Sequence, residues 1–114
     1  MYTVEGGTKA QRKVVETAMS YVIQLLVIPS NIRIEIVLDK FDSHGVIQLS
    51  KSSFLMEIHK KVDNAEIAYT VFHEMKHVEQ MAAQRLMHTD DKVLWLGEDH
   101  TDTEYFNRPW EVEA

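Results

Sequence analysis

The chain has 114 residues, enough for one domain with a single modest hydrophobic core. Hydrophobic residues make up 45% and charged residues 26%, a soluble globular balance, and no apolar run approaches the roughly 20 residues of a membrane span. There is no cysteine, which excludes disulfides, thiolate zinc sites and cysteine nucleophiles. We therefore expect one domain over residues 1–114, a cytoplasmic monomer without membrane association, whose metal ligands could only be histidine and carboxylate.

The net charge of −6 lies entirely in the C-terminal quarter of the chain. Residues 1–88 carry ten acidic and ten basic residues, whereas residues 89–114 carry eight acidic residues against Lys92 and Arg108. An acidic chain without a stripe of lysine and arginine is unsuited to nucleic acid, so no such partner is expected. Most of these acids should be solvated, and some could face a cation, either a metal or a basic substrate.

The first half predicts a helix followed by three strands. Residues 1–7 read as a flexible or edge segment, and Thr8 can cap a helix whose apolar stripe continues until Pro29 stops it. Alternating apolar and polar residues predict strands at residues 32–39, 45–50 and 54–60, with a polar turn at residues 40–45. Because the links are short, an antiparallel meander is expected.

The second half predicts a long helix, a strand and a short final helix. Asp63 with Glu66 three residues later has the form of a capping box, and no glycine or proline interrupts the apolar pattern until about residue 87. Residues 92–96 read as a short strand, and Asn107 could cap a last helix that begins at Pro109. The fold class is therefore α+β: an N-terminal helix, a small, mainly antiparallel sheet of three to four strands, the long helix and a short C-terminal helix.

Within the long helix, residues 73–77 read His-Glu-Met-Lys-His and match the pattern H-E-x-x-H. A helix brings residues four apart onto one face, so His73 and His77 could bind one metal ion. Glu74 follows the first histidine and could reach the water that the metal activates.

A catalytic zinc ion needs a third protein ligand. The metzincin extension would place a glycine and a histidine where the chain has Gln80 and Ala83, so that class is excluded. On a continuous helix, His88 would lie about 16 Å along the axis from His77, too far to share an ion.

Two groups of candidates for the third ligand remain. Asp99, His100 and Asp102 belong to the acidic loop, whereas Glu111 and Glu113 belong to the predicted last helix. Two residues on a helix differ by about 200° of rotation, so only one of these two glutamates can face the metal.

The C-terminal run from Tyr105 to Ala114, YFNRPWEVEA, follows the H-E-x-x-H motif and a Trp95-Leu96-Gly97 segment. Together they resemble small gluzincin-type zinc metallopeptidase domains, many of them phage-encoded or prokaryotic, distantly related to the minigluzincins and the ImmA/IrrE group. The resemblance covers roughly residues 54–114 and implies a zincin-like fold. It also implies that the third ligand is a glutamate followed directly by alanine, which is Glu113. Lys76 departs from the pattern, because these motifs usually have an uncharged residue there.

The resemblance implies a Zn2+-dependent hydrolase acting on peptide or protein substrates, with His73, His77 and Glu113 as ligands. Glu74 would be the general base, and Tyr105 could donate a hydrogen bond to the oxyanion. Substrate is expected to lie along an edge strand, at residues 54–59 or 93–96.

Two alternatives involve no catalysis. A non-catalytic or latent domain could use the same zinc site to stabilise its fold or to recognise a partner, and a metal-free interaction domain would bind no stoichiometric metal. Glu74 favours the enzyme, because a structural zinc site has no use for a carboxylate beside the metal's water.

Overall fold

The computed structural model describes residues 1–41, 43–89 and 91–114. Asp42 of the predicted turn and Asp90 of the acidic segment lie outside the described residues. The fold is α+β, as expected, with two long helices, a four-stranded sheet and a three-stranded sheet in this part of the chain. None of its helices combines the length and apolarity that crossing a membrane requires.

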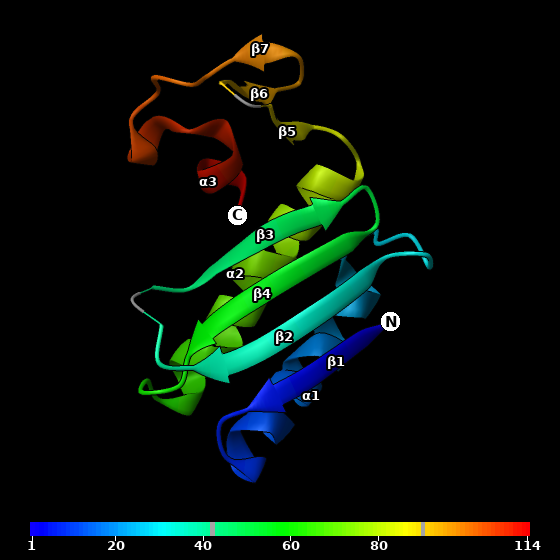
Figure 1. Cartoon of the computed structure of the whole chain (residues 1–114), viewed down its shortest axis with the longest axis vertical. Helices are drawn as coiled ribbons and strands as arrows, with labels where there is room; N and C mark the ends of the chain where they lie inside the picture. Colours follow the sequence, from blue (N-terminus) through cyan, green and yellow to red (C-terminus); the bar gives the residue numbers. More distant parts are fainter. Residues whose placement is uncertain (42, 90) are drawn as a thin grey trace.

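The larger sheet contains β1 (Tyr2–Gly6), β2 (Arg33–Asp39), β3 (Gly45–Ser50) and β4 (Ser53–His59) in the order β1-β2-β4-β3 (Figure 1). β1, β2 and β4 run parallel, and only β3 is antiparallel to its neighbour. The predicted antiparallel meander is therefore wrong, although its last hairpin, β3–β4, is confirmed.

The order of the strands agrees with their burial. Alternate residues of β4 are fully buried, whereas four of the six residues of β3 are exposed. β4 lies in the interior of the sheet beside β2, and β3 forms an edge. Residues 54–59 consequently have neighbours on both sides and offer no free edge to a substrate.

Both long helices pack against one face of this sheet (Figure 1). α1 (Lys9–Leu25) begins with the predicted cap: the Thr8 hydroxyl accepts from the Gln11 N–H at 3.0 Å, and the Gln11 side chain accepts from the Thr8 N–H at 2.9 Å. α2 (Asn64–Ala82) begins at the predicted Asp63, whose carboxylate accepts from the Glu66 N–H at 2.8 Å. The buried stripes of both helices meet the inward side chains of β2 and β4 in one core.

α2 ends five residues earlier than predicted. Gln84 adopts a left-handed conformation with φ of 59°, and the Arg85 N–H donates to the Gln80 carbonyl at 2.9 Å, which turns the chain away from the helix axis. The sequence carries no glycine or proline at this point to indicate the stop.

The described residues of 86–114 form a small subdomain beyond the end of α2, which is called the cap below. β5 (Leu86–His88), β6 (Val93–Trp95) and β7 (Glu98–Asp99) pair antiparallel in that order, so the predicted strand at residues 92–96 is confirmed but is also an interior strand. A 3₁₀ turn, η1 (Tyr105–Asn107), leads into α3 (Pro109–Glu113). α3 begins at Pro109, as predicted, but its capping residue is Arg108 rather than Asn107.

We predict that Gly6→Ala destabilises the fold far more than Gly97→Ala. Both glycines have positive φ, at 81° and 85°, so an alanine is conformationally strained at either position. Only at Gly6 would the added Cβ also overlap the Leu38 carbonyl in the neighbouring strand, whereas nothing lies within 4 Å at Gly97. The extra loss of unfolding free energy should be about 1–3 kcal/mol, measured by chemical denaturation. Equal losses would contradict the tight packing of β1 on β2.

Candidate metal centre

His73 and His77 lie one turn apart in the middle of α2, and both rings point toward the cap. Their ring centroids are 4.8 Å apart with the planes nearly perpendicular. Nε2 of His73 lies 3.1 Å from Oε1 of Glu111, and Nε2 of His77 lies 3.0 Å from the same oxygen. Two imidazole nitrogens and one carboxylate oxygen thus converge at a single place.

Glu111 reaches the histidines because α3 packs beside the second half of α2. The Trp110 side chain is only 6% exposed and joins the main core, which fixes the position of this short helix. Glu111, the next residue, then faces the two histidines.

The structure does not bring Glu113 to the histidines. Its carboxylate accepts two hydrogen bonds of 2.8 Å from Nη1 of Arg85 and one of 3.1 Å from Nε2 of Gln80. Burial would raise the pKa of Glu113, but the hydrogen bonds from Arg85 and Gln80 hold it below its ordinary value. The two glutamates diverge because a two-residue step on a helix turns the side chain by about 200°. The carboxylate that faces both histidines is therefore Glu111, not the Glu113 that the family pattern implied.

Glu74 lies beside the histidine pair, and its side chain is buried. His73, Glu74 and His77 form a group whose potential ligand atoms lie within 4.8 Å of one another. Burial raises the pKa of Glu74, the two histidines act in the opposite direction, and Glu111 raises it further. A carboxylate with a raised pKa beside a potential metal site is suited to accepting a proton.

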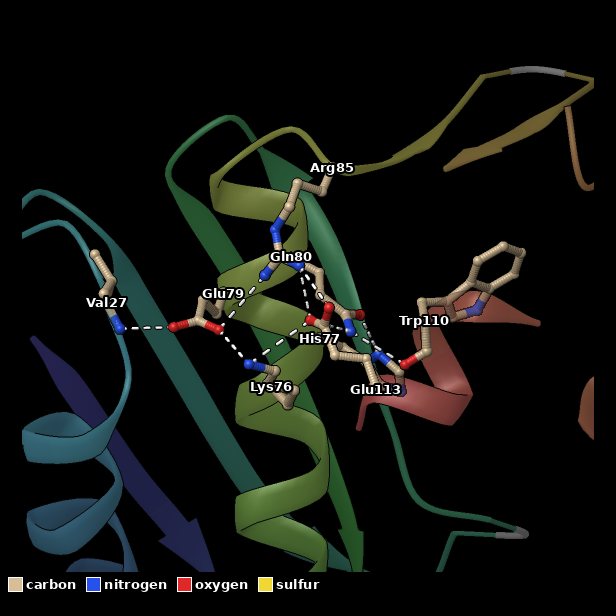
Figure 2. A network of polar contacts seen from close by, with 8 residues as sticks. All are labelled: Val27, Lys76, His77, Glu79, Gln80, Arg85, Trp110 and Glu113. Carbon is tan, nitrogen blue, oxygen red and sulfur yellow. Dashed lines mark hydrogen bonds and ion pairs between the residues drawn. The ribbon is translucent and has the colours of Figure 1, made fainter. Parts of the chain in front are cut away.

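Lys76 points away from the histidines, although it lies between them in the sequence. Its ammonium donates to Oε1 of Glu79 at 2.7 Å and lies 3.6 Å from Oε1 of Glu113. Glu79 also accepts from the backbone N–H of Val27 at 2.6 Å, which ties the segment after α1 to α2 (Figure 2). The positive charge of Lys76 is thus neutralised on a different face of the helix.

A cleft of about 330 Å³ opens over Glu74 and the histidine pair. It is bordered by the start of β3, by α2, by the cap and by Tyr105 at the rim. Its lining contains five of the chain's six histidines: His44, His73, His77, His88 and His100.

His88 and His100 are the two of these histidines that the sequence offers as alternative third ligands. His88 lies on the cleft because α2 ends early and β5 turns back. The separation of His88 from His77 that was derived for a continuous helix therefore does not apply. Burial, and then the proximity of His77, lower its pKa. Nδ1 of His100 lies 3.1 Å from the Thr103 hydroxyl. The described residues show no contact of Asp99 or Asp102 with the histidine pair; Asp99 instead accepts from the N–H of Thr101 at 2.9 Å.

Tyr105 lies at the rim of the cleft and is 51% exposed. Its hydroxyl is 3.5 Å from Oε1 of Glu111. Burial, followed by the nearby charges of Glu111 and Glu74, raises its pKa, so the phenol keeps its proton at neutral pH and can donate a hydrogen bond.

Sequence reasoning missed Gln80 and Arg108. Gln80 is fully buried and touches His77, and Arg108 lines the cleft with its guanidinium 5.5 Å from the Tyr105 ring. A signal for Gln80 was present, because it is a polar residue next to the apolar stripe of α2. Nothing in the local pattern around Arg108 indicates a cleft.

Comparison of the chain with protein-family models, with curated proteins and with solved structures found no match. A function has to be inferred from the chemistry of this site.

Proposed function

We propose that the protein is a zinc-dependent metallopeptidase of zincin type, with His73, His77 and Glu111 as the metal ligands. The observation that carries the proposal is the convergence of two Nε2 atoms on one carboxylate oxygen, at 3.1 and 3.0 Å. Two histidines and one glutamate are a ligand set found in catalytic zinc sites, and three protein ligands leave a position for water.

The donor atoms suit a cation. A neutral imidazole offers one N–H donor and one lone pair, and an ionised carboxylate only accepts, so Nε2 of each histidine can meet Glu111 either as an N–H donor or as a lone-pair ligand of a shared metal ion. Nδ1 of His73 is buried without a hydrogen-bond partner among the described residues, so Nε2 is the ring nitrogen through which His73 contacts the site. A bound zinc ion would supply Lewis acidity, polarising the scissile carbonyl and lowering the pKa of water.

Glu74 is the proposed general base. Its buried carboxylate, with the pKa raised, takes the proton of the attacking water and then delivers it to the leaving nitrogen. A general base is most effective when its pKa approaches the working pH, and burial moves Glu74 in that direction.

Tyr105 is the proposed oxyanion donor. The phenol stays protonated and stands at the rim of the cleft, so it can donate to a negatively charged oxygen that develops near Glu111.

The substrate is proposed to be an extended peptide lying along β3. The two strands named from the sequence are interior to their sheets, whereas β3 is an edge, and its first residues, Gly45 and Val46, line the cleft. A free edge offers main-chain donors and acceptors to an added strand regardless of its side chains.

We predict that the purified chain binds one equivalent of zinc and that Glu111→Ala and Glu113→Ala separate the two candidate ligands. Losing a ligand should weaken zinc binding by more than the roughly 10–100-fold that losing an outer partner costs. Glu113→Ala should stay within that range, because Glu113 contacts Arg85 and Gln80 rather than the histidines. Calorimetric titration of chelator-stripped protein measures both affinities. Tight binding by Glu111→Ala together with its loss in Glu113→Ala would restore Glu113 as the ligand.

We predict that Glu74→Gln keeps the zinc but loses peptide hydrolysis by about 10²–10⁴-fold, because the amide cannot accept a proton. The assay is cleavage of an unstructured, dye-labelled protein, with chelator-treated wild type as the blank. Glu66→Gln makes the same change in the exposed first turn of α2 and should leave the rate unchanged. Hydrolysis that persists both in Glu74→Gln and after chelation would refute the proposed activity and leave the domain as a non-catalytic module.

A further inference from the structure

Arg108 is half-buried and lines the cleft that opens over Glu74 and the histidine pair. Residues 89–114 contain eight acidic residues and only two basic ones, of which Arg108 is one. None of the described acidic residues pairs with it, because the ion pairs in this part of the chain use histidine, Lys76 and Arg85 as their cations. A half-buried cation without a counter-charge costs free energy unless a ligand supplies the negative charge.

The guanidinium of Arg108 is oriented by contacts within the cap. Its Nε donates to the Thr103 backbone carbonyl at 3.1 Å, and its central carbon lies 5.5 Å from the centre of the Tyr105 ring. One N–H and one face of the planar group are therefore in use. The two Nη groups form no hydrogen bond with the described residues, and such a pair of donors matches the two oxygens of a carboxylate.

Tyr105 connects this cation to the residues at the centre of the site. The Arg108 guanidinium lies over its ring, and its hydroxyl is 3.5 Å from Oε1 of Glu111, the oxygen that both histidines contact. Arg108 and Glu111 are thus separated by about the size of one tyrosine side chain. An extended peptide advances by about 3.3–3.6 Å per residue, so only a few residues of a substrate would span the two places.

The acidic residues of the cleft do not neutralise Arg108. Glu74 and Glu111 are the only acidic residues among the described residues that line it. Glu111 contacts the Nε2 atoms of both histidines, and Arg108 forms a salt bridge with neither glutamate. A ligand that neutralises Arg108 must therefore bring its own negative charge. An unmodified peptide carries such a charge only as a carboxylate, at its C-terminus or on an aspartate or glutamate.

We propose that Arg108 binds a carboxylate of the peptide substrate, either the free C-terminus or an acidic side chain, and thereby places a nearby peptide bond over the histidine pair. The cleavage of that bond rests on the proposed function, whereas the binding of the carboxylate does not require the metal.

Three N-acetylated peptides with the same neutral sequence distinguish the two sources of the carboxylate. The first ends in a free carboxylate, the second in an amide, and the third ends in an amide but carries one glutamate near that end. Their affinities are measured by calorimetric titration of chelator-treated protein at about pH 8, because zinc or a protonated histidine would itself attract a carboxylate. At least one carboxylate peptide should bind about 10–100-fold more tightly than the second peptide, as expected for a charge-assisted bidentate pair.

Arg108→Gln should abolish this preference, because the glutamine side chain carries no charge. Arg108→Lys keeps the charge but loses the paired donors, so it should retain only part of the preference. Arg33→Gln is the matched control, since it removes an exposed arginine on β2 outside the cleft and should leave the preference unchanged. Circular dichroism checks that each variant is folded. If Arg108→Gln does not fold, Arg108→Lys and the wild-type comparison decide the question.

The inference is overturned if the wild type binds all three peptides equally, including no measurable binding, or if a folded Arg108→Gln or Arg108→Lys keeps the full preference. A preference for the first peptide alone supports it with the C-terminus as the source, and a preference for the third alone supports it with an acidic side chain. With zinc added, the preferred peptide should be cleaved with a kcat/KM about 10–100-fold above that of the second peptide. If the binding preference is found but no peptide is cleaved, the proposed function fails and Arg108 remains a carboxylate-binding residue.

Discussion

The docking of α3 against the second half of α2 is the contact on which the candidate site depends. The two histidines belong to one helix and need no tertiary contact to lie on one face. The carboxylate that both histidines contact, Glu111, lies more than thirty positions away in the sequence. It is held there by a buried tryptophan, Trp110, on one side and by the Gln80 amide and the Arg85–Glu113 ion pair on the other.

The side chains of α2 face three different parts of the structure. An apolar stripe that includes Val71 and Met75 packs under the sheet without exposure. Lys76 and Glu79 face the segment after α1 and neutralise each other. The histidines occupy the remaining face, under the cleft. Buried polar groups on such a helix are stable only when each is paired, which makes the partners of His77 as important to the site as the histidine itself.

Much of the fold was predictable, because it depends on local periodicity and caps. Thr8 and Asp63 begin α1 and α2 as predicted, and β2, β3 and β4 lie where alternation of apolar and polar residues placed them. β5 and β7 were not predicted, because they lie in the segments expected to be the end of the long helix and the acidic loop. The order of the strands was not predictable from the short links. β4 follows β3 in the chain but lies between β2 and β3 in the sheet, so it has a paired neighbour on each side. The early end of α2 depends on the left-handed Gln84, a residue without a glycine's signal.

For the site, the amino-acid sequence alone determined the pair His73 and His77, the adjacent Glu74, and the restriction to histidine and carboxylate ligands. These follow from helical spacing and composition, which are properties of neighbouring residues. Only the tertiary structure brought Glu111 rather than Glu113 to the histidines, brought His88 to the cleft and placed Gln80 against His77. The reason is physical: spacing shows that the two glutamates face opposite ways, but which way α3 is rotated is set by the burial of Trp110.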